Sequence, residues 1–210
     1  MAAARRVILA TGNAGKLREI RALLAGCGFE VLPQSDLGVV PILEDGATFV
    51  DNALIKARHA ARVSGLPAIA DDSGLEVHAL QGRPGVLSAR YAGATSSDDD
   101  NKTKLLLELA GVPSRERGAR YRCAMVFVRD AEDPQPVICE ASWEGRIGIT
   151  PRGAGGFGYD PLFEVAGDAR TAAEMPAEEK NTVSHRGQAL RALVAALVKE
   201  GSDRNHGDGV

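Results

Sequence analysis

The first forty residues constrain the fold most, because they read as a strand, a turn, a helix and a second strand. An apolar run at residues 6–10 is followed by turn residues 11–15, and apolar residues then recur at helical spacing until Gly26 and Gly28. Residues 29–32 read as the second strand. A unit of this kind normally holds its two strands parallel, with a right-handed crossover. The fold class is therefore α/β.

The middle of the chain predicts a second helix and two further strands. Thr48 opens the helix, whose face of small residues ends before Gly65. Residues 68–70 read as a short buried strand that stops at a turn, Asp71-Asp72-Ser73-Gly74, and residues 75–80 alternate as another strand. Two acids thus stand where a strand ends, which is where open α/β sheets bind ligands.

The remaining pattern predicts a mixed sheet in a single domain over residues 1–200. Residues 121–127 and 137–149 read as a long hairpin, and the longest helical pattern runs over residues 184–199. The last ten residues, 201–210, are polar and rich in glycine, so we expect a disordered tail.

Composition excludes several classes of protein. The 25 Lys and Arg against 28 Asp and Glu give a net charge of −3, and aromatic residues make up 4%, which disfavours a nucleic-acid binder. No run approaches the roughly 18 apolar residues of a membrane span, and the amino-terminal run is too short for a secretion signal, so we expect a cytoplasmic protein with no membrane partner. Cys27, Cys123 and Cys139 have neither disulfide nor zinc spacing.

The loop at residues 11–16 has the features of a phosphate site. It lies between a strand and a helix, where backbone N–H groups and the helix dipole favour an anion, and its glycines allow close approach. Only two residues separate Gly12 from Gly15, and Leu17 follows Lys16, so the loop is not the P-loop of kinases and ATPases.

Four acids in two segments indicate a metal–triphosphate site. Glu44-Asp45 and Asp71-Asp72 flank the second helix, and Mg²⁺ prefers one or two carboxylates together with waters and substrate phosphates. Asp72-Ser73-Gly74 also matches the tripeptide of aspartic proteases, but a protease would need a second such tripeptide or a symmetric dimer, and Asp71 would complicate the proton that its carboxylates share.

Two late segments offer contacts for a nucleobase. The glycine run at residues 153–158 ends on Phe157, Tyr159 and Asp160, and a ring there can stack on a base. Lys180 and the run Ser184-His185-Arg186 cluster donors near the start of the last helix, which suits an anion or a carbonyl oxygen.

In this order the segments closely resemble the inosine/xanthosine triphosphate pyrophosphatase family, over about residues 7–198. Five motifs carry the resemblance: Thr11-Gly12-Asn13-x-x-Lys16, Glu44 with Phe49-x-x-Asn52-Ala53-x-x-Lys56-Ala57, Ala70-Asp71-Asp72-Ser73-Gly74-Leu75, Gly156-Phe157-Gly158-Tyr159-Asp160-Pro161, and Ser184-His185-Arg186-Gly187. The resemblance implies hydrolysis of deaminated purine nucleoside triphosphates to a monophosphate and pyrophosphate. It also implies a homodimer and an elongated mixed sheet flanked by helices, with two lobes and the substrate cleft between them.

The resemblance also implies residue roles. Glu44 and Asp72 would hold Mg²⁺, and Asp72 would be the base for the attacking water, although the spacing leaves Asp71 as an alternative. The triphosphate would contact the loop residues and one more lysine: Thr11, Gly12, Asn13, Ala14, Gly15, Lys16 and Lys56. Ser73 would touch substrate, and the nucleobase pocket would use Phe157, Gly158, Tyr159, Asp160, Lys180, His185 and Arg186.

Two other functions remain open at this point. A related pyrophosphatase for pyrimidine or modified nucleotides would share the loop and the acids but not Ser184-His185-Arg186. A nucleotide-binding sensor without catalysis would not need the acids at 44, 71 and 72 together.

Overall fold

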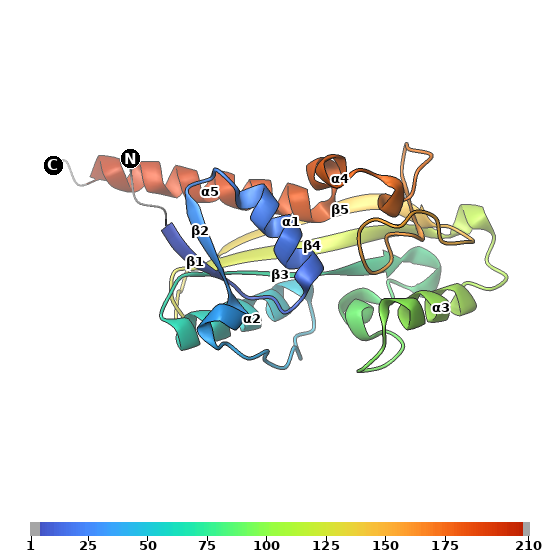
Figure 1. The fold of residues 1–210 in the computed structure, drawn as a ribbon, viewed down its shortest axis with the longest axis horizontal. Coiled ribbons are helices and arrows are strands. Elements are labelled where there is room, and N and C mark those ends of the chain that lie inside the picture. The colour runs from blue at the N-terminus through green and yellow to red at the C-terminus, as the bar shows by residue number, and fades with distance from the viewer. Residues whose placement is uncertain (1–4, 208–210) are drawn as a thin grey trace. The chain divides into compact units, whose positions relative to one another are not determined.

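A computed structural model describes residues 5–207, with side chains as far as residue 199. Its sheet has six strands in the order β2-β1-β3-β4-β5-β6. The elements, labelled in Figure 1, are β1 (Arg5–Leu9), α1 (Ala14–Leu24), β2 (Phe29–Pro33), α2 (Phe49–Ser64), β3 (Ala68–Val77), α3 (Asp98–Glu108), β4 (Gly118–Val128), β5 (Val137–Ile147), β6 (Phe163–Val165), α4 (Ala177–Val183) and α5 (His185–Gly207).

The predicted mixed α/β sheet is confirmed. β1 pairs in parallel with both β2 and β3, whereas β5 and β6 are antiparallel. The expected strand–helix–strand unit is β1, α1 and β2. Thr48 and Ser97 cap α2 and α3, each with a capping box that satisfies free N–H groups of the first turn.

The chain divides into two compact units, each discontinuous in sequence. Unit 1 comprises residues 1–72, 124–140 and 186–210, and unit 2 comprises residues 73–123 and 141–185. Because the chain passes between the units repeatedly, no single cut separates them, and the single domain over residues 1–200 stays a prediction. The elongated shape and the cleft between lobes also stay predictions.

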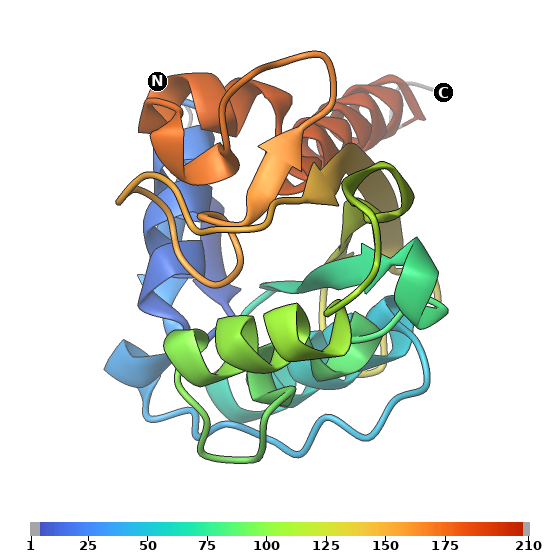
Figure 2. The ribbon, with the colours of Figure 1, turned by 90° about the vertical axis from the view of Figure 1, so that its right-hand side faces the viewer.

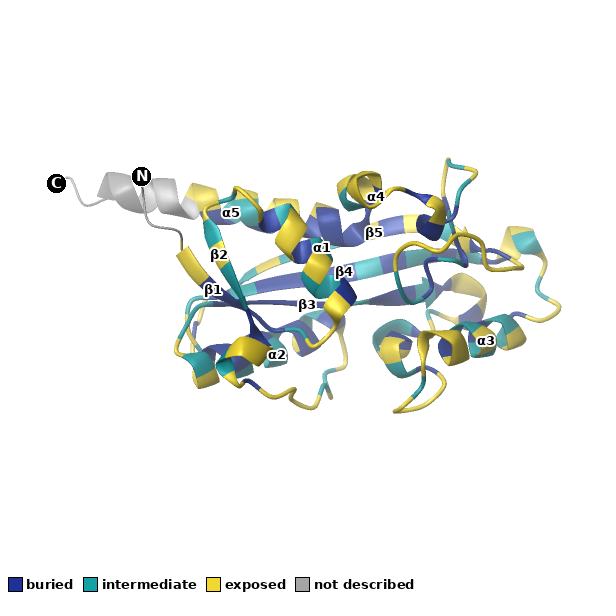
Figure 3. Ribbon diagram, viewed as in Figure 1, coloured by how far each residue is buried: buried dark blue, intermediate teal, exposed yellow. Residues whose placement is uncertain are grey.

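Unit 1 is built on the parallel strands β1, β2 and the first half of β3. Figure 1 shows α2 on one face of these strands and α1 with α5 on the other. The core residues are small on the α2 side, where Ala53, Ala57 and Ala60 are fully buried, so helix and sheet pack closely. The buried residues follow the strands in Figure 3.

Unit 2 has its own aromatic core. Tyr121, Trp143 and Phe163 pack together, with the ring centroids of Tyr121 and Phe163 4.6 Å apart. In Figure 2, α3 is seen in green and α4 in orange as separate helices of this unit.

One local prediction is wrong. The turn expected at Asp71-Asp72-Ser73-Gly74 is instead part of one continuous strand, β3, because cationic side chains from the neighbouring helices pair with both carboxylates. α5 extends to Gly207, and the disordered tail over residues 201–210 stays a prediction. Residues 208–210 lie outside the described residues.

Candidate active site

The loop at residues 11–16 is held by its own side chains. Asn13 caps α1, and its Oδ1 accepts from the amides of Gly15 at 2.8 Å and Lys16 at 3.0 Å. Thr11 Oγ1 accepts from the Asn13 amide at 3.2 Å. Because the cap engages these two helix amides, the ammonium of Lys16 is the charged group that the loop offers to an anion.

Strand register places this loop beside the acid pair. Leu9, the last residue of β1, lies opposite Ile69, and the Ala10 amide donates to the Ile69 carbonyl at 2.8 Å. β1 therefore ends where β3 reaches Asp71, and Lys16 Nζ lies 3.1 Å from Asp71 Oδ2. The phosphate loop and the acids, separate in sequence, are neighbours in unit 1.

Asp71 is the anionic centre of a buried charge network. Its side chain is 0% exposed and also contacts Arg186 Nε at 3.2 Å, while Arg186 reaches Glu19 of α1. Burial alone would raise the pKa of Asp71, but the charges of Lys16 and Arg186 outweigh it and hold that pKa well below its usual range. Asp71 is therefore ionised throughout the neutral range.

Asp72 has different partners and the opposite shift. Its Oδ1 lies 2.8 Å from Lys56 Nζ, and its Oδ2 accepts from Asn52 Nδ2 at 3.3 Å. The pKa of Asp72 is raised, chiefly because burial disfavours the charged form, and the negative charge of Glu44 adds to the shift against the opposing effect of Lys56. Of the two acids, Asp72 is the better proton acceptor.

Lys56 joins Asp72 to Glu44. Its Nζ lies 2.8 Å from Glu44 Oε2 as well as from Asp72 Oδ1. Burial would lower the pKa of Lys56, but the neighbouring carboxylates raise it, so the ammonium stays charged. Both carboxylates thus already contact a single cation, and they are within reach of one metal ion.

A small hollow lies at these groups. It has a volume of about 40 Å³, and its lining includes Thr11, Gly12, Glu44, Lys56 and His59. His59 has no role predicted from the sequence, yet its Nε2 is hydrogen-bonded to the Val40 carbonyl at 2.9 Å, which holds the segment before Glu44. Its position one helical turn after Lys56 is the signal that would have found it.

In unit 2, Asp160 organises the predicted nucleobase segment. Its Oδ1 accepts from Tyr121 at 3.1 Å, and its Oδ2 accepts from the Phe157 amide at 2.9 Å and from Lys180 Nζ at 2.6 Å. Gly156, at φ +71°, lies so close to Asp160 that a Cβ would collide with the carboxylate. The backbone at Gly156 and Phe157 is thereby fixed around one buried acid.

Ring contacts position the other residues of this segment. Lys180 Nζ lies 5.2 Å from the centre of the Phe157 ring, within cation–π range. His185 stacks on Tyr121 at 4.7 Å with the planes 9° apart. Tyr159 is buried and donates to the Ser88 carbonyl at 2.9 Å, so it supports the segment from within the core.

The predicted residues thus form two groups. Unit 1 contains Thr11, Gly12, Asn13, Ala14, Gly15, Lys16, Glu44, Lys56, Asp71, Asp72 and Arg186, and unit 2 contains Ser73, Phe157, Gly158, Tyr159, Asp160, Lys180 and His185. Arg186 contacts Asp71 and Glu19, whereas its neighbour His185 lies among the rings of unit 2. Their shared place in a nucleobase pocket stays a prediction.

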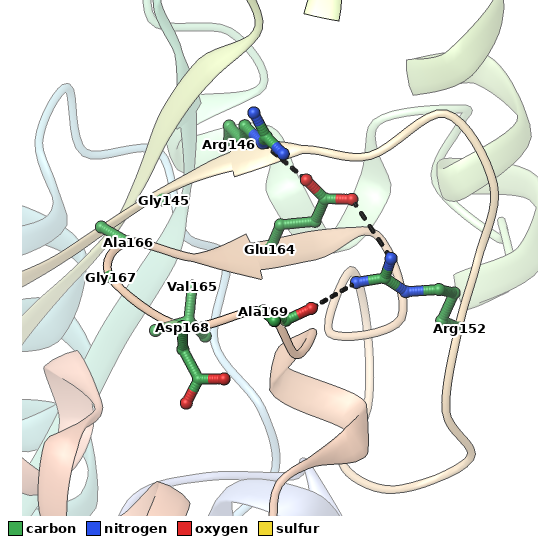
Figure 4. Close-up of a pocket in the computed structure, with 9 residues that line it drawn as sticks. All are labelled: Gly145, Arg146, Arg152, Glu164, Val165, Ala166, Gly167, Asp168 and Ala169. Atoms are coloured by element: carbon green, nitrogen blue, oxygen red, sulfur yellow. Dashed lines mark hydrogen bonds and ion pairs between the residues drawn. The ribbon is translucent and has the colours of Figure 1, made fainter.

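A larger hollow in unit 2, of about 430 Å³, contains none of the predicted residues (Figure 4). Arg146 donates to Glu164 at 2.6 Å, Arg152 lies 3.7 Å from the same carboxylate, and Arg152 also donates to the Ala169 carbonyl at 3.0 Å. The charges along its wall compensate one another, so it has no excess charge to attract an ionic substrate.

Comparison with known proteins decides the family. The sequence model of the Ham1 family matches residues 7–196. This chain belongs to the Ham1 family. Within the described residues, no helix of this family member is long and apolar enough to cross a membrane.

Relatives of known name cover nearly the whole chain. A dITP/XTP pyrophosphatase of Methylococcus capsulatus is 61% identical over 193 residues, 92% of this chain and 96% of the relative. One of Escherichia coli (strain K12) is 53% identical over 192 residues, 91% of this chain and 98% of the relative. The solved structure of a HAM1 protein from Coxiella burnetii matches with a TM-score of 0.86 at 46% identity, over 93% of this chain and 99% of that one.

Besides His59, three residues of this Ham1 family member contribute to the site without a role predicted from sequence. Glu19 holds Arg186, Tyr121 holds Asp160, and Asn52 holds Asp72. Asn52 belongs to the motif Phe49-x-x-Asn52-Ala53-x-x-Lys56-Ala57. Its position one helical turn before Lys56 is the sequence signal that could have indicated its role. Glu19 and Tyr121 lie 167 and 39 residues from their partners, and no spacing rule links them.

We predict that Asp160→Asn destabilises the protein by about 3–5 kcal/mol, because it leaves the buried Lys180 ammonium without its counter-charge. Urea denaturation measures the loss. Asp168→Asn is the control, since Asp168 pairs with Arg170 at the surface and its loss is expected to cost much less. Equal stability of the two variants would contradict the role of Asp160.

Proposed function

We propose that this chain hydrolyses deaminated purine nucleoside triphosphates, the inosine and xanthosine forms, to the monophosphate and pyrophosphate. Membership of the Ham1 family and the dITP/XTP pyrophosphatase relatives at 53–61% identity support the reaction. The observation that carries it is the unit 1 site, where Asp72, whose pKa is raised, and Glu44 contact the same Lys56 ammonium, and where Glu44 and Lys56 line a small hollow.

Asp72 is the base in this proposal. A general base must accept a proton from the attacking water, and the raised pKa of Asp72 suits that task. Asp71 is the poorer base, because Lys16 and Arg186 stabilise its charge. Asp71 instead holds Lys16 in place for the triphosphate, and Lys56 adds a second positive charge.

Mg²⁺ fits the residues present. Glu44 and Asp72 contact the same Lys56 atom, and carboxylate oxygens are the ligands that Mg²⁺ prefers. Among the described residues, no group of three or more His, Cys, Asp and Glu side chains is arranged to hold a metal, so phosphates and waters would complete the coordination. When bound, the metal would offset the charge that develops on the pyrophosphate leaving group.

Unit 2 would recognise the base. Inosine and xanthosine carry an acceptor carbonyl at purine position 6, whereas adenosine carries an amino donor. Lys180 lies over the Phe157 ring and His185 stacks on Tyr121, and both side chains can donate to the carbonyl. A donor on the base facing these donors would be penalised. The resemblance further supports a cytoplasmic homodimer.

A substrate panel tests the proposal directly. We expect pyrophosphate release from inosine, deoxyinosine and xanthosine triphosphates to exceed release from ATP and from pyrimidine triphosphates by about 10²-fold or more. Faster turnover of a pyrimidine or modified nucleotide would favour the related pyrophosphatase. Binding without release of pyrophosphate would favour the sensor.

We predict that Asp72→Asn lowers kcat by about 10²–10⁴-fold, because the water loses its base. Asp71→Asn should mainly lower stability, since it leaves Lys16 and Arg186 with one anion fewer, and should lower kcat less. Steady-state kinetics per folded enzyme separates the two variants. A near-normal rate in Asp72→Asn with a large loss in Asp71→Asn would assign the base to Asp71.

We also predict that Lys180→Met, compared per folded enzyme, lowers kcat/KM for inosine triphosphate by about tenfold or more relative to that for ATP. A donor toward the 6-carbonyl is removed, whereas the lost counter-charge of Asp160 affects both substrates. Lys104→Met is the matched control. Lys104 Nζ lies 4.5 Å from the centre of the Tyr91 ring, as Lys180 lies over Phe157, and it donates to the Tyr91 carbonyl at 2.7 Å, but Lys104 is not among the predicted site residues. An unchanged ratio in Lys180→Met would contradict the donor account.

A further inference from the structure

We propose that Asn52 is a positioning residue that sets the geometry of both metal-binding carboxylates. The inference rests on the proposed function, in which Glu44 and Asp72 hold Mg²⁺. Asn52 lies in α2 with its side chain 1% exposed, and it has no place among the groups assigned to substrate, proton transfer or metal. A buried amide at that place needs partners for its donor and its acceptor.

Both ends of the Asn52 amide are engaged. Its Oδ1 accepts from the Gly46 amide at 2.8 Å, and its Nδ2 donates to Asp72 Oδ2 at 3.3 Å. Gly46 offers an N–H and Asp72 a carboxylate, so only one orientation of the amide satisfies both. The side chain therefore ties the segment that carries Glu44 to the strand that carries Asp72.

The absence of a side chain at Gly46 is what permits this contact. A Cβ at Gly46 would lie 2.6 Å from Asp51 Cβ, 2.8 Å from Asn52 Oδ1 and 2.9 Å from the Asn52 amide nitrogen. Only glycine lets the backbone come so close to the first turns of α2. Glu44 is two residues earlier, so fixing Gly46 against Asn52 restricts the position of the Glu44 carboxylate.

Asn52 and Lys56 each contact a different carboxylate oxygen of Asp72. They stand one helical turn apart on the same face of α2, and Lys56 contacts Asp72 Oδ1 and Glu44 Oε2. A divalent cation between the two carboxylates would compete with Lys56 for these oxygens. Asn52 holds other atoms, Asp72 Oδ2 and the Gly46 amide, so its contacts are compatible with a bound metal.

A purely structural role makes a different prediction, and Asn101 provides the comparison. Asn101, in α3 of unit 2, is 3% exposed, and its Oδ1 accepts from the Ala92 amide at 2.8 Å while its Nδ2 donates to the Ala89 carbonyl at 3.3 Å. It matches Asn52 in type and burial and likewise uses both ends of its amide, with one more bond from Ser96 Oγ at 2.9 Å, but it contacts neither carboxylate. Loss of either amide should lower the Tm, and only loss of Asn52 should alter the metal site.

The experiment compares Asn52→Ala, Asn52→Asp and Asn101→Ala in the full chain with two readouts that need no turnover. Electron paramagnetic resonance measures Mn²⁺ binding in the presence of a non-hydrolysable inosine triphosphate analogue. Hydrogen–deuterium exchange of the metal-free protein measures protection of residues 44–47. We expect Asn52→Ala to weaken Mn²⁺ binding by about tenfold or more, as loss of partners that orient metal ligands does, and to speed exchange of that segment.

Asn52→Asp keeps the shape and the acceptor for the Gly46 amide but removes the donor to Asp72. Asn52→Asp should retain the exchange protection of residues 44–47 and have a lower kcat than the wild type. It is the test variant if Asn52→Ala does not fold. Mn²⁺ affinity and exchange in Asn52→Ala equal to those of Asn101→Ala would overturn the proposal. If the wild-type protein binds no Mn²⁺ in the presence of the nucleotide analogue, the proposed metal site is overturned instead. In that case the hydrogen exchange still tests the contact between Asn52 and Gly46, and unchanged exchange of residues 44–47 in Asn52→Ala would refute it.

Discussion

The alternation of side chains along β3 is the constraint on which the site depends. Neighbouring residues of a strand point to opposite faces, so Asp71 and Asp72 are adjacent in sequence yet have separate surroundings. Asp71 meets Lys16 of α1 and Arg186 of α5, and Asp72 meets α2. One strand thereby provides a carboxylate of lowered pKa and one of raised pKa, which separates a structural anion from a base.

Buried acids organise the predicted site in both units, and Asp71, Asp72 and Asp160 each pair with a lysine. In unit 1 the Lys56 ammonium joins Asp72 to Glu44, and in unit 2 Lys180 pairs with Asp160 beside Phe157. A buried carboxylate without partners would be costly, so these pairs fix the loops around them to one geometry. The residues proposed to bind phosphate, metal and base are thus held by the charges that the site itself requires.

The α/β class and the segments that carry chemistry are predictable from sequence, because periodicity and motif spacing are local properties. The β1–α1–β2 unit and the caps Thr48 and Ser97 follow this rule. The continuation of β3 through Asp71 is not predictable this way, since it depends on Arg186, 115 residues away. The roles of Glu19 and Tyr121 are not predictable from sequence for the same reason, because their contacts form only when segments distant in sequence pack together.

In the proposed reaction, water activated at Asp72 attacks the α-phosphorus of an inosine or xanthosine triphosphate. Hydrolysis of inosine triphosphate in water enriched in ¹⁸O, followed by mass spectrometry of both products, locates the attack. Attack at the α-phosphorus places one ¹⁸O atom in the monophosphate and none in the pyrophosphate. Label in the pyrophosphate, or formation of a diphosphate and inorganic phosphate, would rule out this reaction.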